Sequence, residues 1–127
     1  MSTNNYYIAG DYTNGGSNSA WQATDLSIPE GVSVNFKAVG AVSGLFTSDT
    51  ACNSVGPGGA DPFNTDALAP ELNNCAAIGK VGENGKPFLV ADNQLISPTG
   101  GGQLYLAVND ILATDNKGGF FVEVSFS

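Results

Sequence analysis

Residues 103–126 decide the fold of this chain: they read QLYLAVND (103–110), ILATDNKGG (111–119) and FFVEVSF (120–126). In the first run the apolar residues Leu104, Leu106 and Val108 alternate with Tyr105 and Ala107. In residues 120–126 every second residue is likewise Phe or Val. A period of two predicts a β-strand with one buried face. Two such runs joined by a polar, glycine-containing loop predict an antiparallel hairpin.

The loop between these two runs is rich in oxygen donors. Asp110 stands where the first run ends, and Asp115 and Asn116 stand just before the second. Carboxylate, amide and free carbonyl oxygens are the ligands that calcium requires. The EF-hand pattern does not fit, because Leu112 occupies the third position and no Glu closes the loop. Asp, Asn and Gly are also ordinary turn formers, so both interpretations remain open at this point.

The rest of the chain also predicts strands. Residues 32–38 alternate as cleanly as the C-terminal runs, Asn84-Gly85 is the strongest hairpin signal, and 17 glycines and six prolines in 127 residues favour many turns. No long helical pattern interrupts them. We therefore predict one domain, residues 1–127, with an all-β fold: an antiparallel β-sandwich or jelly roll of about eight short strands. Besides the two C-terminal runs, the expected strands are residues 6–9, 21–28, 32–38, 76–82, 87–90 and 94–96.

The net charge of the chain limits the kinds of molecule that it can bind. Twelve acidic residues against four lysines give a formal net charge of −8. Such a surface repels nucleic acid and anionic membranes, and it suits cations and neutral ligands such as sugars. No apolar stretch is long enough for membrane insertion.

Enzymatic activity is not expected. The chain has no histidine, which removes the usual general base, the Ser-His-Asp and Cys-His arrangements and the commonest zinc ligand. Its carboxylates are scattered, and none stands in an apolar setting that suggests a raised pKa.

Two cysteines, Cys52 and Cys75, flank part of a long polar segment. A disulfide in an exported protein and two buried free thiols in a cytosolic protein are both compatible with this pattern. The first residues show no signal peptide. A loop as long as residues 47–74 is commonly functional, and the alternative is a decorative insertion.

Four segments, in order, resemble the LecA-type bacterial galactose-binding lectins and the wider set of LecA-like β-sandwich modules. The fourth is the most specific, because it is similar to an Asn-Asp…Asn/Asp-Asn-x-Gly-x-Phe signature. The resemblance covers most of the chain from Trp21 onward. The four segments are residues 21–28 (WQATDLSI), 29–40 (PEGVSVNFKAVG), 75–85 (CAAIGKVGENG) and 109–120 (NDILATDNKGGF).

The resemblance implies a calcium ion bound mainly by the loop after residue 109. The ion itself engages two adjacent hydroxyls of a neutral sugar, such as a galactose-like one. Asp61 and Asn64, on either side of Pro62, stand near the positions where the lectin places a His and a Gln against the sugar. With Asp110 and Asp115 they form the expected sugar contacts. The expected metal ligands are side-chain oxygens of Asp110, Asp115 and Asn116 and backbone carbonyls from Leu112 or Thr114 and from Gly44.

The sequence thus favours a calcium-dependent carbohydrate-binding module, extracellular or at the cell surface. The alternative is a structural, adhesin or cell-surface assembly domain whose calcium only stabilises the loop. Trp21 is expected to pack rather than to stack on sugar. Tyr105 and Phe121 are expected to face outward on the predicted hairpin, where they would pack on a covering loop or join copies into a homo-oligomer.

Overall fold

A computed structural model describes residues 2–9, 21–44, 58–59, 68–69, 71–73, 75–90, 94–96, 100–109 and 116–126. Within these ranges the chain is all-β, and no helix there has the length and apolar character that crossing a membrane requires. The strands are β1 (Ser2–Ala9), β2 (Gln22–Ile28), β3 (Val34–Gly44), β4 (Ala77–Val81), β5 (Phe88–Leu89), β6 (Gln94–Ile96), β7 (Gly102–Val108) and β8 (Asn116–Phe126).

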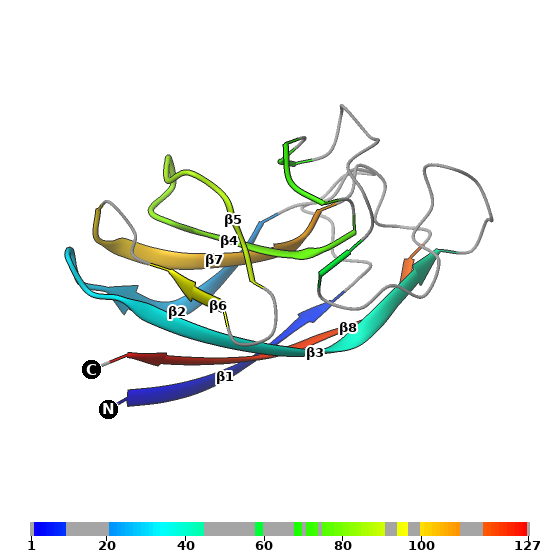
Figure 1. Cartoon of the computed structure of the whole chain (residues 1–127), viewed down its shortest axis with the longest axis horizontal. Coiled ribbons are helices and arrows are strands. Elements are labelled where there is room, and N and C mark those ends of the chain that lie inside the picture. The colour runs from blue at the N-terminus through cyan, green and yellow to red at the C-terminus, as the bar shows by residue number, and fades with distance from the viewer. Residues whose placement is uncertain are drawn as a thin grey trace.

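These strands form two four-stranded sheets that lie one over the other (Figure 1). The first sheet has the order β1-β8-β3-β6, and the second has the order β2-β7-β4-β5. Every pairing between neighbouring strands is antiparallel. The predicted all-β, antiparallel β-sandwich is therefore confirmed.

The predicted C-terminal hairpin is wrong. Strand β7 lies in the second sheet between β2 and β4, whereas β8 lies in the first sheet between β1 and β3. The chain therefore changes sheet between the end of β7 and the start of β8. Alternation shows that each strand has one buried face, but it does not identify the neighbouring strand. Two strands that face the same core from opposite sheets show the same pattern as a hairpin.

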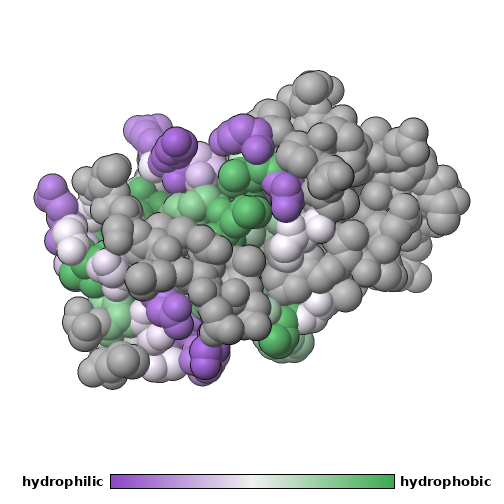
Figure 2. All heavy atoms as spheres, viewed as in Figure 1, coloured by the Kyte–Doolittle hydropathy of each residue, from purple (hydrophilic) through white to green (hydrophobic). Residues whose placement is uncertain are grey.

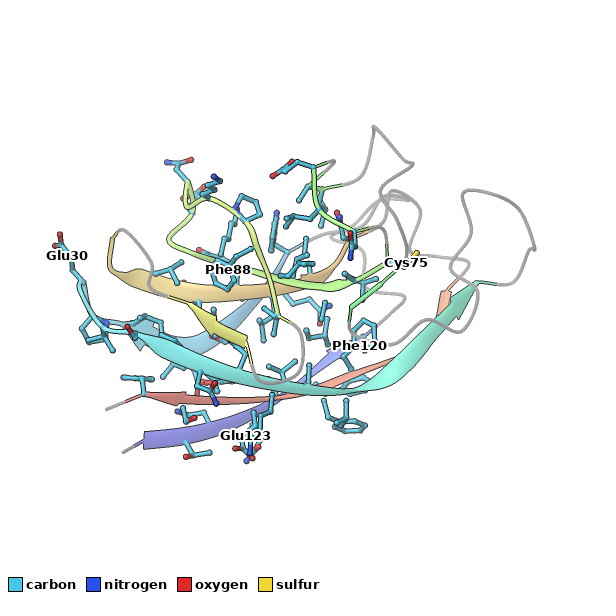
Figure 3. The ribbon with its side chains drawn as sticks, viewed as in Figure 1. Glu30, Cys75, Phe88, Phe120 and Glu123 are labelled. Atoms are coloured by element: carbon cyan, nitrogen blue, oxygen red, sulfur yellow. The ribbon has the colours of Figure 1, made fainter. Side chains whose placement is uncertain are left out.

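The core lies between the sheets and is built from the alternating residues of both. Phe120 projects into this space in Figure 3, and its side chain is fully buried. The predicted inward faces of residues 104–108 and 120–124 are confirmed. The buried cluster contains Ile8, Ile28, Val34, Phe36, Ala38, Cys75, Ala77, Val81, Val90, Leu104, Leu106, Val108, Phe120, Val122 and Val124.

The second sheet buries part of its outer face as well. Ala76, Ile78 and Ala107 form a second buried cluster with Ala69, against which Leu68 and Leu72 pack. Small residues suit these strands, since a covering segment lies on one face and the core on the other.

Two hydrogen bonds donated by side chains join the edge strands β1 and β2. The Tyr6 hydroxyl donates to Oδ1 of Asp25 at 2.9 Å, and Nε2 of Gln22 donates to the Ala9 carbonyl at 3.1 Å. Burial raises the pKa of Tyr6 to about 12, and the hydrogen bond to Asp25 and its negative charge act in the same direction. These contacts connect the two sheets at this edge.

Two turns are placed by the structure. The hairpin around Asn84-Gly85 is confirmed, because β4 and β5 pair antiparallel on either side of it. In the turn before β3, Pro29 does not take the first central position, which proline often occupies. Instead the Val32 amide donates to the Pro29 carbonyl at 3.4 Å, so Pro29 precedes the central pair. Gly31, with a φ of 81°, takes the position that favours glycine.

Two glycines of positive φ, Gly40 and Gly31, differ in the space beside them, and this difference can be tested. Gly40 has a φ of 114°, and a Cβ there would lie 2.5 Å from the Gly119 carbonyl oxygen. We expect Gly40→Ala to lower the free energy of unfolding by about 3 kcal/mol, from backbone strain and a clash that only a shift of β8 would relieve. Gly31→Ala, where a Cβ meets nothing within 4 Å, should cost about 1 kcal/mol for its φ alone. Urea unfolding measures both. Equal losses for the two variants would contradict the close approach of Gly40 to β8.

Candidate functional site

The expected metal ligands are carried by the chain between β7 and β8 and by the end of β3. Asp110, Leu112, Thr114 and Asp115 lie outside the described residues. The structure does place the backbone of the other two. Gly44 and Asn116 are partners at the last position of the β3–β8 ladder. The register therefore brings together two candidate ligands that are 72 positions apart in the sequence.

Other sequence-predicted positions are not placed. Asp61 and Asn64, the candidate sugar contacts on the long loop, lie outside the described residues. Within the described ranges, no three Asp, Glu, Cys or His side chains are close enough to hold a metal ion. The metal assignment consequently stays a prediction.

Asn109 is a residue whose role the sequence did not reveal. It follows the last residue of β7 and is fully buried, the only polar residue in the buried core of the described chain. Its Oδ1 accepts from the Ala69 amide at 2.8 Å. Its Nδ2 donates to the carbonyls of Ala69 at 2.8 Å, Leu72 at 3.3 Å and Asn73 at 2.9 Å. One side chain therefore holds the segment that covers the second sheet.

The backbone of Asn109 is fixed too. Its amide donates to the Ala76 carbonyl at 2.9 Å, and its carbonyl accepts from the Cys75 amide at 2.6 Å. A buried amide side chain with this many partners is structural, since all its polar atoms are satisfied within the protein. The sequence signal was available: an Asn at the end of an apolar strand must find hydrogen-bond partners if it is buried.

Cys75, whose amide donates to the Asn109 carbonyl, is also held in place. Its side chain is 1% exposed, its φ is 63°, and it is disulfide-bonded. The only other cysteine in the sequence is Cys52, which lies outside the described residues. In Figure 3 Cys75 lies at the end of the sandwich opposite to the turn that carries Glu30. Asn109 and Cys75 together fix the point from which the chain leaves β7 toward the metal candidates.

The outward-facing aromatics do not lie together, contrary to the hairpin expectation. Phe121 is 61% exposed on the outer face of the first sheet. Tyr105 belongs to the second sheet, where it is half-buried. Its ring centroid lies 5.3 Å from Nζ of Lys80. The same ammonium lies 4.8 Å from the ring of Trp21. Trp21 packs against the second buried cluster, as expected. Phe121 faces outward as predicted, but the two rings lie on different sheets because β7 and β8 do not form a hairpin.

Comparisons with known proteins point to a fold. No protein family matches the chain, and no curated protein matches it either. Among solved structures, the chain is similar to one described as "EclA N-terminal domain; PllA-like lectin", with a TM-score of 0.65 and 21% sequence identity. The match covers 100% of this chain and 97% of that one. At this identity the likeness concerns the fold, and the chain therefore shares the β-sandwich fold of a PllA-like lectin domain.

Proposed function

We propose that this chain is a carbohydrate-binding domain whose sugar site is built around a calcium ion at the β7–β8 connection. The observation that carries the proposal is the likeness over the full chain to a domain described as a lectin. Because fold alone does not determine function, the proposal also rests on the donor atoms of the site.

The donor set fits calcium. The connection supplies two carboxylates, Asp110 and Asp115, and an amide oxygen of Asn116, and calcium accepts oxygen ligands in flexible arrangements. The pairing of Gly44 with Asn116 supports a contribution from the end of β3. When bound, the ion would supply open coordination positions that two neighbouring sugar hydroxyls can occupy. The chain's own residues would hold these ligands in place, with Asn109 fixing the start of the connection.

The surroundings favour a neutral ligand and an extracellular location. A net charge of −8 disfavours anionic ligands, and a bound divalent cation would offset two of these charges locally. The disulfide at Cys75 supports an oxidising compartment.

A glycan array, run once with calcium and once with a chelator, tests the proposal. We expect calcium-dependent signals on particular neutral glycans, because chelation removes the ion that binds their hydroxyls. Silence in both runs would overturn the sugar assignment. If the chelator still lowered the melting temperature, the result would favour the alternative of a structural domain stabilised by calcium.

A further inference from the structure

The outer face of the first sheet carries an exposed row of apolar side chains. Tyr7 and Val39 are both register partners of Phe121, so the three residues form one row across β1, β8 and β3. Tyr7 is 51% exposed, Val39 is 60% exposed and Phe121 is 61% exposed. In Figure 2 hydrophobic side chains reach the surface at the lower edge, the side on which this sheet lies. Unlike the second sheet, this face has no covering segment among the described residues.

The hydroxyl end of the Tyr7 ring lies over a glycine in the neighbouring strand β8. A Cβ built at Gly119 would lie 2.5 Å from Oη and 2.6 Å from Cζ of Tyr7, and it would also meet the Ile8 carbonyl, so any side chain there would displace the ring. Gly119 itself is buried, whereas half of Tyr7 remains exposed. The exposed part of this aromatic ring offers a surface for stacking.

Phe121 forms a wall beside this surface. Its ring centroid lies 4.9 Å from that of Tyr7, and the two ring planes make an angle of 52°. Gly40, Gly118 and Gly119 leave the adjoining hollow free of side chains. The two aromatic rings and the glycines make an open corner that is apolar on two sides.

The next row along the sheet is polar. Asn5 and Lys37 are both register partners of Glu123, which points away from the core in Figure 3. These three side chains line the same groove as Tyr7, Val39 and Phe121, and the groove has a volume of about 600 Å³. An amide, an ammonium and a carboxylate can together donate to and accept from hydroxyl groups. The groove thus offers an apolar corner beside a hydrogen-bonding edge, in the size range of small-ligand sites.

We propose that this groove is a second carbohydrate contact site, which does not need calcium. The C–H face of a sugar ring would stack on Tyr7 against Phe121, and its hydroxyls would reach Asn5, Lys37 and Glu123. The pattern of the groove matches the two surfaces of a pyranose, which is apolar on its C–H face and polar around its rim. The choice of a saccharide over other neutral ligands rests on the proposed carbohydrate-binding function.

A second copy of the chain fits this face less well. At the observed exposures, the three apolar side chains offer roughly 300 Å². A stable protein interface buries about 800 Å² on each partner, of which roughly 450 Å² is non-polar. Two chains of net charge −8 also repel one another.

The test uses the whole chain in chelator, with amide NMR spectra recorded during titration with methyl β-galactopyranoside and methyl β-glucopyranoside. We expect at least one sugar to shift the amide signals of Tyr7, Phe121 and Glu123. Phe121→Leu keeps an apolar side chain but removes the ring, and should weaken binding about fivefold. Phe121→Tyr, which keeps the ring, should weaken binding less than Phe121→Leu does. Tyr105→Leu, an aromatic replacement on the second sheet, is the matched control and should leave binding unchanged.

Three results would overturn this second site. One is the absence of shifts on this face with both sugars, and another is equal affinity of Phe121→Leu and the unmodified chain. The third is shifts that follow protein concentration without sugar, which would identify a second copy as the occupant. The calcium proposal fails separately. If sugar shifts these signals in chelator but the array shows no calcium-dependent signal, only the groove binds sugar. If binding depends on calcium and no signal on this face shifts, only the metal site binds sugar.

Discussion

Asn109→Ala is expected to lower the free energy of unfolding by about 3–4 kcal/mol, since it removes the partner of several buried backbone groups at once. The Ala69 amide loses its acceptor, and the carbonyls of Ala69 and Asn73 lose a donor at 2.8 and 2.9 Å. A methyl group cannot replace these bonds, and the lost volume leaves space beside the end of β7. Urea unfolding followed by tryptophan fluorescence measures the loss through Trp21, which packs against the second buried cluster.

The matched control for this loss is Asn73→Ala, the same replacement four residues beyond Ala69. The Asn73 side chain donates one exposed hydrogen bond, to the Gly58 carbonyl. Its removal should cost less than about 1 kcal/mol. Similar stabilities for Asn109→Ala and Asn73→Ala would show that Asn109 does not hold the covering segment.

Asp110→Ala is expected to abolish calcium binding, because it removes a carboxylate from the proposed ligand set one residue after the fixed Asn109. Titration calorimetry with calcium measures the effect. Glu30→Ala is the matched control: it also removes one negative charge, from an exposed turn at the far end of the sandwich from Cys75 (Figure 3). That variant should bind calcium as the unmodified chain does.

The thermal stability of the same proteins gives an independent readout. If the ion binds the folded chain, saturating calcium raises the melting temperature of the unmodified protein and of Glu30→Ala, and chelator reverses the gain. Asp110→Ala should show no difference between calcium and chelator. Unchanged calcium affinity in Asp110→Ala would refute the assignment of this residue as a ligand.

The sequence alone determined which residues face the core. Alternation over residues 32–38, 104–108 and 120–124 identified the inward faces, because side chains on a strand point alternately to opposite sides. The exception is Val32, which precedes β3 and is only half-buried. Asn84-Gly85 correctly located the hairpin between β4 and β5, although the hydrogen-bonded turn runs from Gly82 to Gly85, with the Gly85 amide donating to the Gly82 carbonyl. These are short-range properties, and the residues that decide them are neighbours in the chain.

Only the tertiary structure decided which strands pair. Strands β7 and β8 present the same alternation whether they form a hairpin or face each other across the core, and the structure places them in different sheets. That arrangement puts Asn116 opposite Gly44 and separates Phe121 from Tyr105. It also brings Tyr7, Phe121 and Val39 into one row from three strands that are distant in the sequence. The burial of Asn109 likewise depends on a segment about 40 residues earlier. The physical reason is that strand pairing, the packing of one sheet on the other and the coverage of their outer faces are long-range contacts, which a pattern along the chain does not encode.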